Sequence, residues 1–284
     1  MKIGVSSYSF LKYIKNEKCN YFKICDIAKE IGFDGIEFVD LDYSEFKITD
    51  DPVSTAAEIK KYCKGIGLDI AAYTVGANFL KEDVAGEVRR LKKCVDVAKK
   101  LGAPTMRFDV CWSLKKEYLY GYEDAINEFA PFIRQVADYA EKKGIRVCTE
   151  NHGQIFQAPE RVEKLIKTVN HKNFGWLCDM GNFLCVDSDP VKACAIAAPY
   201  AFHIHAKDFL FKPCSSIKPE GFMETAHGNF IRGTVIGHGV VPVEQCIKIL
   251  KKSGYDSWIS VEFEGMEDNI PAIKMGFNFL KNVI

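Results

Sequence analysis

The chain has 284 residues, of which 48% are hydrophobic, and its 38 basic side chains balance 38 acidic ones. A zero formal net charge excludes the basic surplus that nucleic-acid binding needs, and no apolar run approaches the ~20 residues of a membrane span. None of the 11 cysteines forms a C-x-x-C motif, so we expect reduced thiols. With no signal peptide before the first expected strand, we predict a cytoplasmic protein without membrane or nucleic-acid partners.

Strand-like and helix-like segments alternate along the whole chain. The expected strands are 2–6, 36–38, 69–74, 105–109, 145–150, 174–179, 201–205 and 258–262. The expected helices are 21–31, 50–66, 81–101, 122–143, 159–169, 190–198, 242–253 and 270–283, with a long polar connection at 212–239. Strict alternation of strand and helix predicts a parallel sheet, and eight units predict one closed (β/α)8 TIM barrel over residues 1–284.

A doubly wound open sheet is the competing architecture. That fold needs a glycine-rich phosphate turn after its first strand. The segment that follows the first strand here, Ser7 to Phe10, contains no glycine. The closed barrel is therefore the preferred prediction.

Four successive expected strands end in a side chain that can bind a metal ion. The set is Glu150, Asp179, His205 and Glu262. Three carboxylates with one imidazole and no thiolate suit a divalent cation such as Mn²⁺, Mg²⁺, Co²⁺ or Zn²⁺. Active sites of barrels lie at the carboxyl ends of their strands, so we predict one metal site there.

Five phrases along the chain resemble the xylose isomerase-like TIM barrel family, the sugar phosphate isomerase/epimerase group. They are residues 32–37 (GFDGIE), 149–152 (TENH), 178–182 (CDMGN), 203–208 (HIHAKD) and 254–262 (GYDSWISVE). The resemblance spans essentially the whole chain. It implies that the four strand-end residues are the ligands of a single divalent ion, with Mn²⁺ as the expected metal. It also implies that Glu150 and Glu262 shuttle a proton, as in the ketose 3-epimerases of this family.

The predicted reaction is an isomerisation or epimerisation of a sugar or keto-sugar. Both reactions remove a proton from a carbon next to a carbonyl, and a divalent cation stabilises the resulting enediolate. A carboxylate on each face can take the proton from one side and return it to the other. Glu150 and Glu262 are the expected pair, and His152 is a further catalytic candidate.

A metal-dependent lyase is the alternative prediction. The ketose 3-epimerases carry a His where this chain has Asn182 and an Arg where it has Phe211, and both groups hold substrate hydroxyls. Related barrels include an inosose dehydratase and the catalytic subunits of C-glycoside deglycosidases that act on 3-keto-glycosides, and these begin with the same proton removal. A three-metal endonuclease and a non-catalytic barrel are the remaining alternatives; six histidines and a zero net charge argue against the first.

Five polar residues near expected strand ends or in loops are candidate contacts for the substrate. They are Glu37, Arg107, Asn182, Lys207 and His238. The expected partner is a small sugar or keto-sugar, with a homo-oligomer or a partner subunit as further possibilities.

Overall fold

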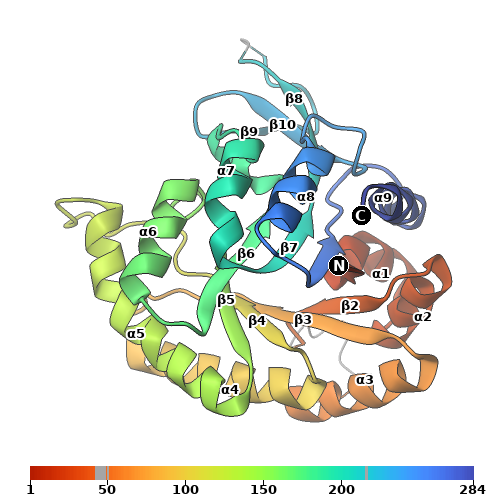
Figure 1. Ribbon diagram of the computed structural model, residues 1–284, viewed down its shortest axis with the longest axis horizontal. Coiled ribbons are helices and arrows are strands. Elements are labelled where there is room, and N and C mark those ends of the chain that lie inside the picture. Colours follow the sequence, from red (N-terminus) through yellow and green to blue (C-terminus); the bar gives the residue numbers. More distant parts are fainter. Residues whose placement is uncertain (42–48, 50, 215–216) are drawn as a thin grey trace.

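The computed structural model describes residues 1–41, 49, 51–214 and 217–284. Eight parallel strands close into a barrel in the order β1-β11-β7-β6-β5-β4-β3-β2 (Figure 1). This confirms the predicted (β/α)8 barrel, while the extent of the domain, 1–284, stays a prediction. The strands are β1 (Lys2–Ser6), β2 (Gly35–Val39), β3 (Asp69–Val75), β4 (Thr105–Phe108), β5 (Arg146–Glu150), β6 (Phe174–Asp179), β7 (Ala201–Ala206) and β11 (Trp258–Val261).

Helices surround the barrel, and their apolar faces form one core with the outer faces of the strands. They are α1 (Leu11–Glu17), α2 (Tyr21–Ile31), α3 (Pro52–Ile66), α4 (Val84–Leu101), α5 (Tyr122–Lys143), α6 (Pro159–Val169), α7 (Pro190–Ala197), α8 (Val243–Lys252) and α9 (Asn269–Val283). Among the described residues, no helix combines the length and apolarity needed to cross a membrane. The 11 cysteines are free thiols in this structure.

Two helix starts show how side-chain caps set the boundaries. The Asp51 carboxylate accepts a hydrogen bond from the backbone N–H of Ser54 and begins α3, while Asp50 of the predicted start lies outside the described residues. Asp83 accepts from the N–H of Gly86, so α4 begins at Val84 rather than at residue 81. In both cases the carboxylate satisfies an N–H that has no partner within the helix.

The turns that follow α2 and α8 lie at the amino-terminal face of the barrel. Gly32 ends α2 with a φ of 111°, and the ring of Phe33 packs edge-on against Phe277 at a centroid distance of 4.8 Å. Gly254 follows α8 with a φ of 89°, and the Tyr255 hydroxyl donates to a carbonyl oxygen on the next strand. Glycine adopts this left-handed conformation without steric cost, so both turns stabilise the fold on the face opposite the strand ends.

The connection predicted as a long polar loop contains a small antiparallel sheet. Its strands, β8 (Asp208–Lys212), β9 (Met223–Glu224) and β10 (Phe230–Thr234), pair in the order β8-β10-β9. Because β8 begins two residues after β7 ends, this flap stands over the carboxyl-end face of the barrel, beyond α7 and α8 (Figure 1). The elements that the sequence pattern did not predict include the flap, α1 with the short 3₁₀ turn Ser7–Phe10 before it, and the 3₁₀ turn Asn182–Val186.

Candidate metal centre

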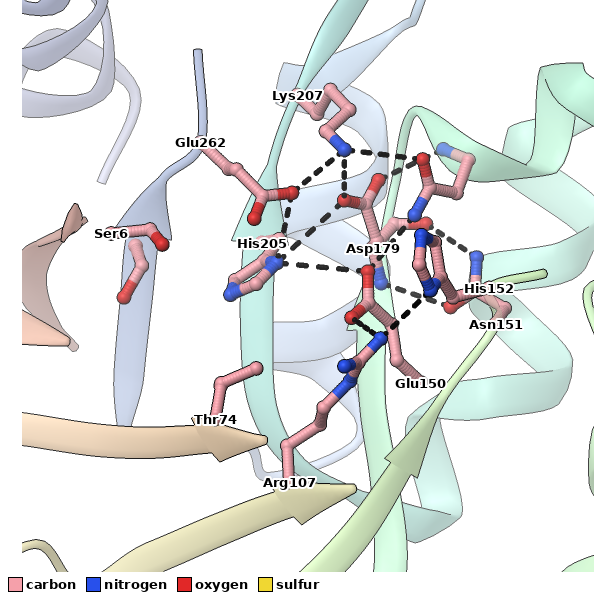
Figure 2. A network of polar contacts seen from close by, with 12 residues as sticks. Ser6, Thr74, Arg107, Glu150, Asn151, His152, Asp179, His205, Lys207 and Glu262 are labelled. Atoms are coloured by element: carbon pink, nitrogen blue, oxygen red, sulfur yellow. Dashed lines mark hydrogen bonds and ion pairs between the residues drawn. The ribbon is translucent and has the colours of Figure 1, made fainter. Parts of the chain in front are cut away.

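The four predicted metal ligands meet at the carboxyl ends of β5, β6, β7 and β11. One ligand atom from each of Glu150, Asp179, His205 and Glu262 lies within 4.8 Å of the others. From Nδ1 of His205, the nearest carboxylate oxygens are 3.8 Å away on Glu150, 3.7 Å on Asp179 and 3.3 Å on Glu262 (Figure 2). All four residues are buried. They meet in the mouth of the barrel because the parallel strands that carry them end at the same face.

Two atoms of this cluster are buried without a hydrogen-bond partner. Asp179 accepts the backbone N–H groups of Gly181 and Asn182 at its Oδ1, both at 2.8 Å, and these bonds leave Oδ2 free. Nδ1 of His205 likewise has no partner. The cation nearest to Oδ2 of Asp179 is the Lys207 ammonium, at 3.4 Å. Buried polar atoms are normally hydrogen-bonded, so a carboxylate oxygen and an imidazole nitrogen that lie 3.7 Å apart without such partners fit a site for a cation.

Glu37 lies beneath the cluster and orients His205. Both of its carboxylate oxygens lie within hydrogen-bond distance of Nε2 of His205, at 2.9 and 3.1 Å. Its other partners are the Thr74 hydroxyl at 2.7 Å and Nε2 of His203 at 2.9 Å. Glu37 and His203 are both buried in the barrel interior. The carboxylate therefore contacts the protein, on the side of His205 that faces away from the predicted ligands.

Arg107 pairs with the first of the two glutamates. Its Nη2 lies 2.7 Å from Oε2 of Glu150 and 2.7 Å from Oδ1 of Asp109. His152 joins the same group, with Nδ1 3.0 Å from Arg107 and 3.1 Å from Asp109. The ring of Trp112 meets the His152 ring edge-on at 4.7 Å. The predicted catalytic His152 is thus connected to Glu150 through a buried guanidinium.

Lys207 pairs with the second glutamate. Its ammonium lies 2.7 Å from Oε2 of Glu262 and 3.2 Å from Oε2 of Glu264. Tyr8 donates its hydroxyl to the other oxygen of Glu264 at 3.3 Å. Lys207 is only 5% exposed, and it is held by carboxylates rather than directed at solvent.

Asn182 connects the two sides of the cluster. Its amide Nδ2 donates to Oε1 of Glu150 at 2.9 Å, and its Oδ1 accepts from Nζ of Lys207 at 3.2 Å. Both ends of the amide are therefore bound to the protein. His238, by contrast, is exposed in the connection after β10, and no hydrogen bond or ion pair found among the described residues joins its side chain to the cluster.

Several residues of the site were not singled out from the sequence. Asp109 ends the expected fourth strand and Glu264 lies two residues beyond Glu262, so their places at strand ends were the available signal. Asn151 accepts the backbone N–H of Asp179 and the indole N–H of Trp176 at 3.0 Å, and its Nδ2 donates to the Asp179 carbonyl at 2.9 Å. These bonds join the ends of β5 and β6 and fix the spacing of two predicted ligands.

The electrostatics of the cluster favour positive charge at its centre. Burial by itself lowers the pKa of His205, but the negative charges of Glu262 and Glu37 outweigh burial and raise that pKa well above its ordinary value. Burial also raises the pKa of Glu150, an effect that Arg107 and His205 only partly offset. Carboxylates that draw a proton onto an imidazole form a place where a divalent cation can replace that proton.

The sequence matches a known protein family. Residues 25–283 match the family described as the xylose isomerase-like TIM barrel, and the chain belongs to that family. Its curated relatives include an inosose dehydratase of Clostridium beijerinckii, 27% identical over 164 residues that make up 56% of this chain and 53% of that protein. The chain thus spans about half the length of the curated relatives it matches first.

Solved structures confirm the fold. The IOLI protein, in a structure with a bound zinc atom, has a TM-score of 0.79 at 19% identity, covering 100% of this chain and 98% of that one. D-psicose 3-epimerase from Clostridium cellulolyticum, in a structure with D-tagatose, has a TM-score of 0.73 at 16% identity, with 100% and 99% coverage. Enzymes that act on small sugar-like molecules therefore share this barrel fold.

Proposed function

We propose that this chain is a divalent-metal-dependent enzyme that removes a proton next to the carbonyl of a neutral, polyhydroxylated ketone. The observation that carries the proposal is the buried cluster of Glu150, Asp179, His205 and Glu262, with two acceptors that lack hydrogen-bond partners. A divalent cation held by these four residues supplies positive charge beside the carbonyl, which lowers the cost of the negative charge created by proton removal.

Mn²⁺ is the ion we propose. Three carboxylates and one imidazole form a donor set that is mostly oxygen and contains no thiolate. Such a set suits Mn²⁺ and Mg²⁺, and it also accepts Zn²⁺ or Co²⁺. The zinc atom in the IOLI structure agrees with a divalent site in this family without fixing the metal of this chain.

The charges around the cluster favour a neutral substrate over a phosphorylated or carboxylated one. Arg107 and Lys207 are the cations in contact with the predicted ligands, and each lies 2.7 Å from a glutamate oxygen. Each has a second carboxylate partner as well, Asp109 for Arg107 and Glu264 for Lys207. A phosphate would have to displace these pairs, whereas hydroxyl groups can hydrogen-bond to them as they stand.

Glu150 and Glu262 are the proposed proton carriers. They come from β5 and from the end of β11 and approach the centre from different strands (Figure 2). In an isomerisation or epimerisation, one carboxylate takes the proton from carbon and the other, or the same one, returns a proton to carbon. The presence of two carboxylates from different strands at one centre is the observation that favours the isomerase candidate.

Elimination is the outcome that the remaining geometry supports better. The two ends of the Asn182 amide are hydrogen-bonded to Glu150 and Lys207. Asn182 is therefore not free to bind a substrate hydroxyl, as the His at this position does in the ketose 3-epimerases. His152 has Nδ1 bound to Asp109 and Arg107, which leaves Nε2 as the nitrogen that can give a proton to a leaving group. The carboxylate would take the proton from carbon, the C–O bond to a β-hydroxyl would break, and water would leave as the C=C bond forms.

Proton NMR in D₂O tests the proposal. The Mn²⁺-loaded enzyme, exchanged into Mg²⁺ for the measurement, is incubated with ketoses, inososes and 3-keto-glycosides, and with a ketose phosphate as the anionic counterpart. Deuterium next to the carbonyl of an intact inverted or isomerised sugar supports the isomerase, whereas release of water or an aglycone supports the lyase. If no substrate exchanges a proton and Glu150→Gln behaves like the wild type, the proposal fails.

A further inference from the structure

We infer that Glu37, predicted from the sequence to contact substrate, is instead a positioning residue that sets the tautomer of His205 for metal binding. The inference rests on the proposed metal site and adds a second layer of residues to it. Three buried side chains lie within hydrogen-bond distance of the Glu37 carboxylate: His205, His203 and Thr74.

Hydrogen-bonding chemistry assigns the proton on His205. A carboxylate only accepts, so Nε2 of His205, at 2.9 Å from Glu37, must carry a hydrogen. In the neutral ring the lone pair then belongs to Nδ1, the nitrogen that lies 3.3 to 3.8 Å from the three predicted carboxylate ligands. Without Glu37, the ring could equally protonate Nδ1 and present the wrong nitrogen to the cation.

Glu37 is itself fixed from several strands. Thr74 on β3 donates to Oε1, while His203 on β7 contacts Oε2. Ser260 on β11 lies 2.9 Å from Nε2 of His203 through its hydroxyl and holds that ring in turn. Glu37 and Ser260 are both 0% exposed, so no substrate can reach the carboxylate while this network is intact. The side chain therefore acts on the reaction only through His205.

The same atoms permit one other interpretation. Glu37, His203 and His205 have ligand atoms close enough to hold a second ion. The Glu37 carboxylate, however, already has hydrogen-bond partners at 2.7 to 3.1 Å in Thr74, His203 and His205. The Ser260 hydroxyl in turn contacts His203. A hydrogen-bonded support layer accounts for all of these distances, so metal stoichiometry separates the two interpretations.

The test compares Glu37→Gln with Glu87→Gln. Glu87 is also a buried carboxylate, with a side chain that is 2% exposed and paired with Lys81 and Arg90, but no hydrogen bond or ion pair found among the described residues joins it to the cluster. We expect Glu37→Gln to raise the Mn²⁺ dissociation constant about 10- to 100-fold, the usual cost of losing such a support residue. Glu87→Gln should leave it unchanged while lowering stability. Mn²⁺ binding is followed by electron paramagnetic resonance, and folding by circular dichroism.

A second readout does not depend on metal affinity. In ¹⁵N-histidine-labelled protein, the Nε2 proton of His205 should give a downfield, slowly exchanging resonance in both the metal-free and the Zn²⁺-loaded states, and Glu37→Gln should abolish it. If Glu37→Gln does not fold, Thr74→Val removes one of the donors to the carboxylate. It should weaken Mn²⁺ binding about threefold, less than Glu37→Gln, because this one hydrogen bond acts on the ion only through Glu37 and His205.

The outcomes separate this inference from the proposed function. If the wild type binds no divalent ion, the proposed function fails and the inference fails with it. If the wild type binds Mn²⁺ and Glu37→Gln binds it equally well with the resonance intact, only the inference is overturned. Two ions per wild-type chain that fall to one in Glu37→Gln would overturn it in favour of a second metal site.

Discussion

Glu150 and Glu262 stand on two sides of the candidate metal centre, and each lies 2.7 Å from one buried cation. Burial raises the pKa of both, but the result differs between them. The pKa of Glu150 stays raised in spite of Arg107. The pKa of Glu262 falls well below its ordinary value because His205 and Lys207 outweigh burial. Equal contact distances thus give unequal proton affinities, since the whole set of neighbouring charges decides them.

The opposite pKa shifts predict different roles for Glu150 and Glu262 in proton transfer. Before a cation binds, Glu150 is the better proton acceptor, while Glu262 stays ionised to lower pH. In an elimination, this asymmetry is useful because only one carboxylate needs to take a proton from carbon. In an epimerisation, two carboxylates of similar proton affinity would serve better, so measurements on the two sides also bear on the type of reaction.

The largest expected effect comes from replacing the proton carriers. Glu150→Gln and Glu262→Gln should each lower kcat by about 10²- to 10⁴-fold, because each removes a carboxylate from proton transfer and from the cation. Deuterium exchange into substrate, measured with each variant saturated in Mn²⁺, distinguishes the two roles. We expect exchange to be lost in Glu150→Gln and partly retained in Glu262→Gln; equal loss in both would argue for symmetric use of the carboxylates.

Removing either buried cation should give the next largest effect. Lys207→Met leaves Glu262 and Glu264 without their ammonium, and Arg107→Met leaves Glu150 and Asp109 without their guanidinium. Each variant should lower the free energy of unfolding of the metal-free protein by about 3 to 5 kcal/mol. Urea unfolding with and without Mn²⁺ measures this. The ion should restore part of the loss, and a deficit unaffected by Mn²⁺ would contradict a shared cation site.

The stability of the metal-free protein should respond to the two glutamates with opposite sign. A raised folded pKa means that Glu150 contributes stability below its unfolded pKa and loses it as the pH rises, so Glu150→Gln should stabilise the protein at pH 7. A lowered folded pKa means that Glu262 contributes stability above about pH 4.3, its unfolded value, and loses it as the pH falls. Glu262→Gln should therefore destabilise at pH 7.

Glu150→Gln and Glu262→Gln should each change the free energy of unfolding by about 1 to 3 kcal/mol, the ordinary range for a buried substitution. Thermal unfolding of the wild type and both variants between pH 3 and pH 8, in the presence of a chelator, measures the difference. The difference in stability between the two variants should become smaller toward low pH, because the glutamate that each variant retains becomes protonated there. Shifts of the same sign at pH 7 would show that the two sides are electrostatically alike.

The smallest expected effect comes from cutting the bridge between the sides. Asn182→Ala removes the amide that joins Glu150 to Lys207 but leaves every predicted ligand in place. Loss of two hydrogen bonds at about 1 kcal/mol each should lower kcat/KM about 30-fold, with Mn²⁺ affinity reduced less. Steady-state kinetics and Mn²⁺ titration measure both. A loss as large as that of Glu150→Gln would mean that Asn182 touches the substrate.

The sequence alone determined the barrel and the four predicted ligands, because both follow from local patterns. Alternation of strand and helix fixes the topology, and side chains at successive strand ends must meet at one edge of the barrel. Glu150, Asp179, His205 and Glu262 could therefore be placed together from their positions along the chain.

Only the tertiary structure decided what surrounds those ligands. The partners Glu37 and His205 are 168 residues apart, and their contact depends on how far each side chain reaches across the closed barrel. The same holds for the pairing of Lys207 with Glu262 rather than with bulk water. It also holds for the flap, whose short strands pair with each other and contact distant residues, as Thr234 does with Glu267. Charge partners and pKa shifts depend on distance and burial, and neither quantity is encoded in residue spacing.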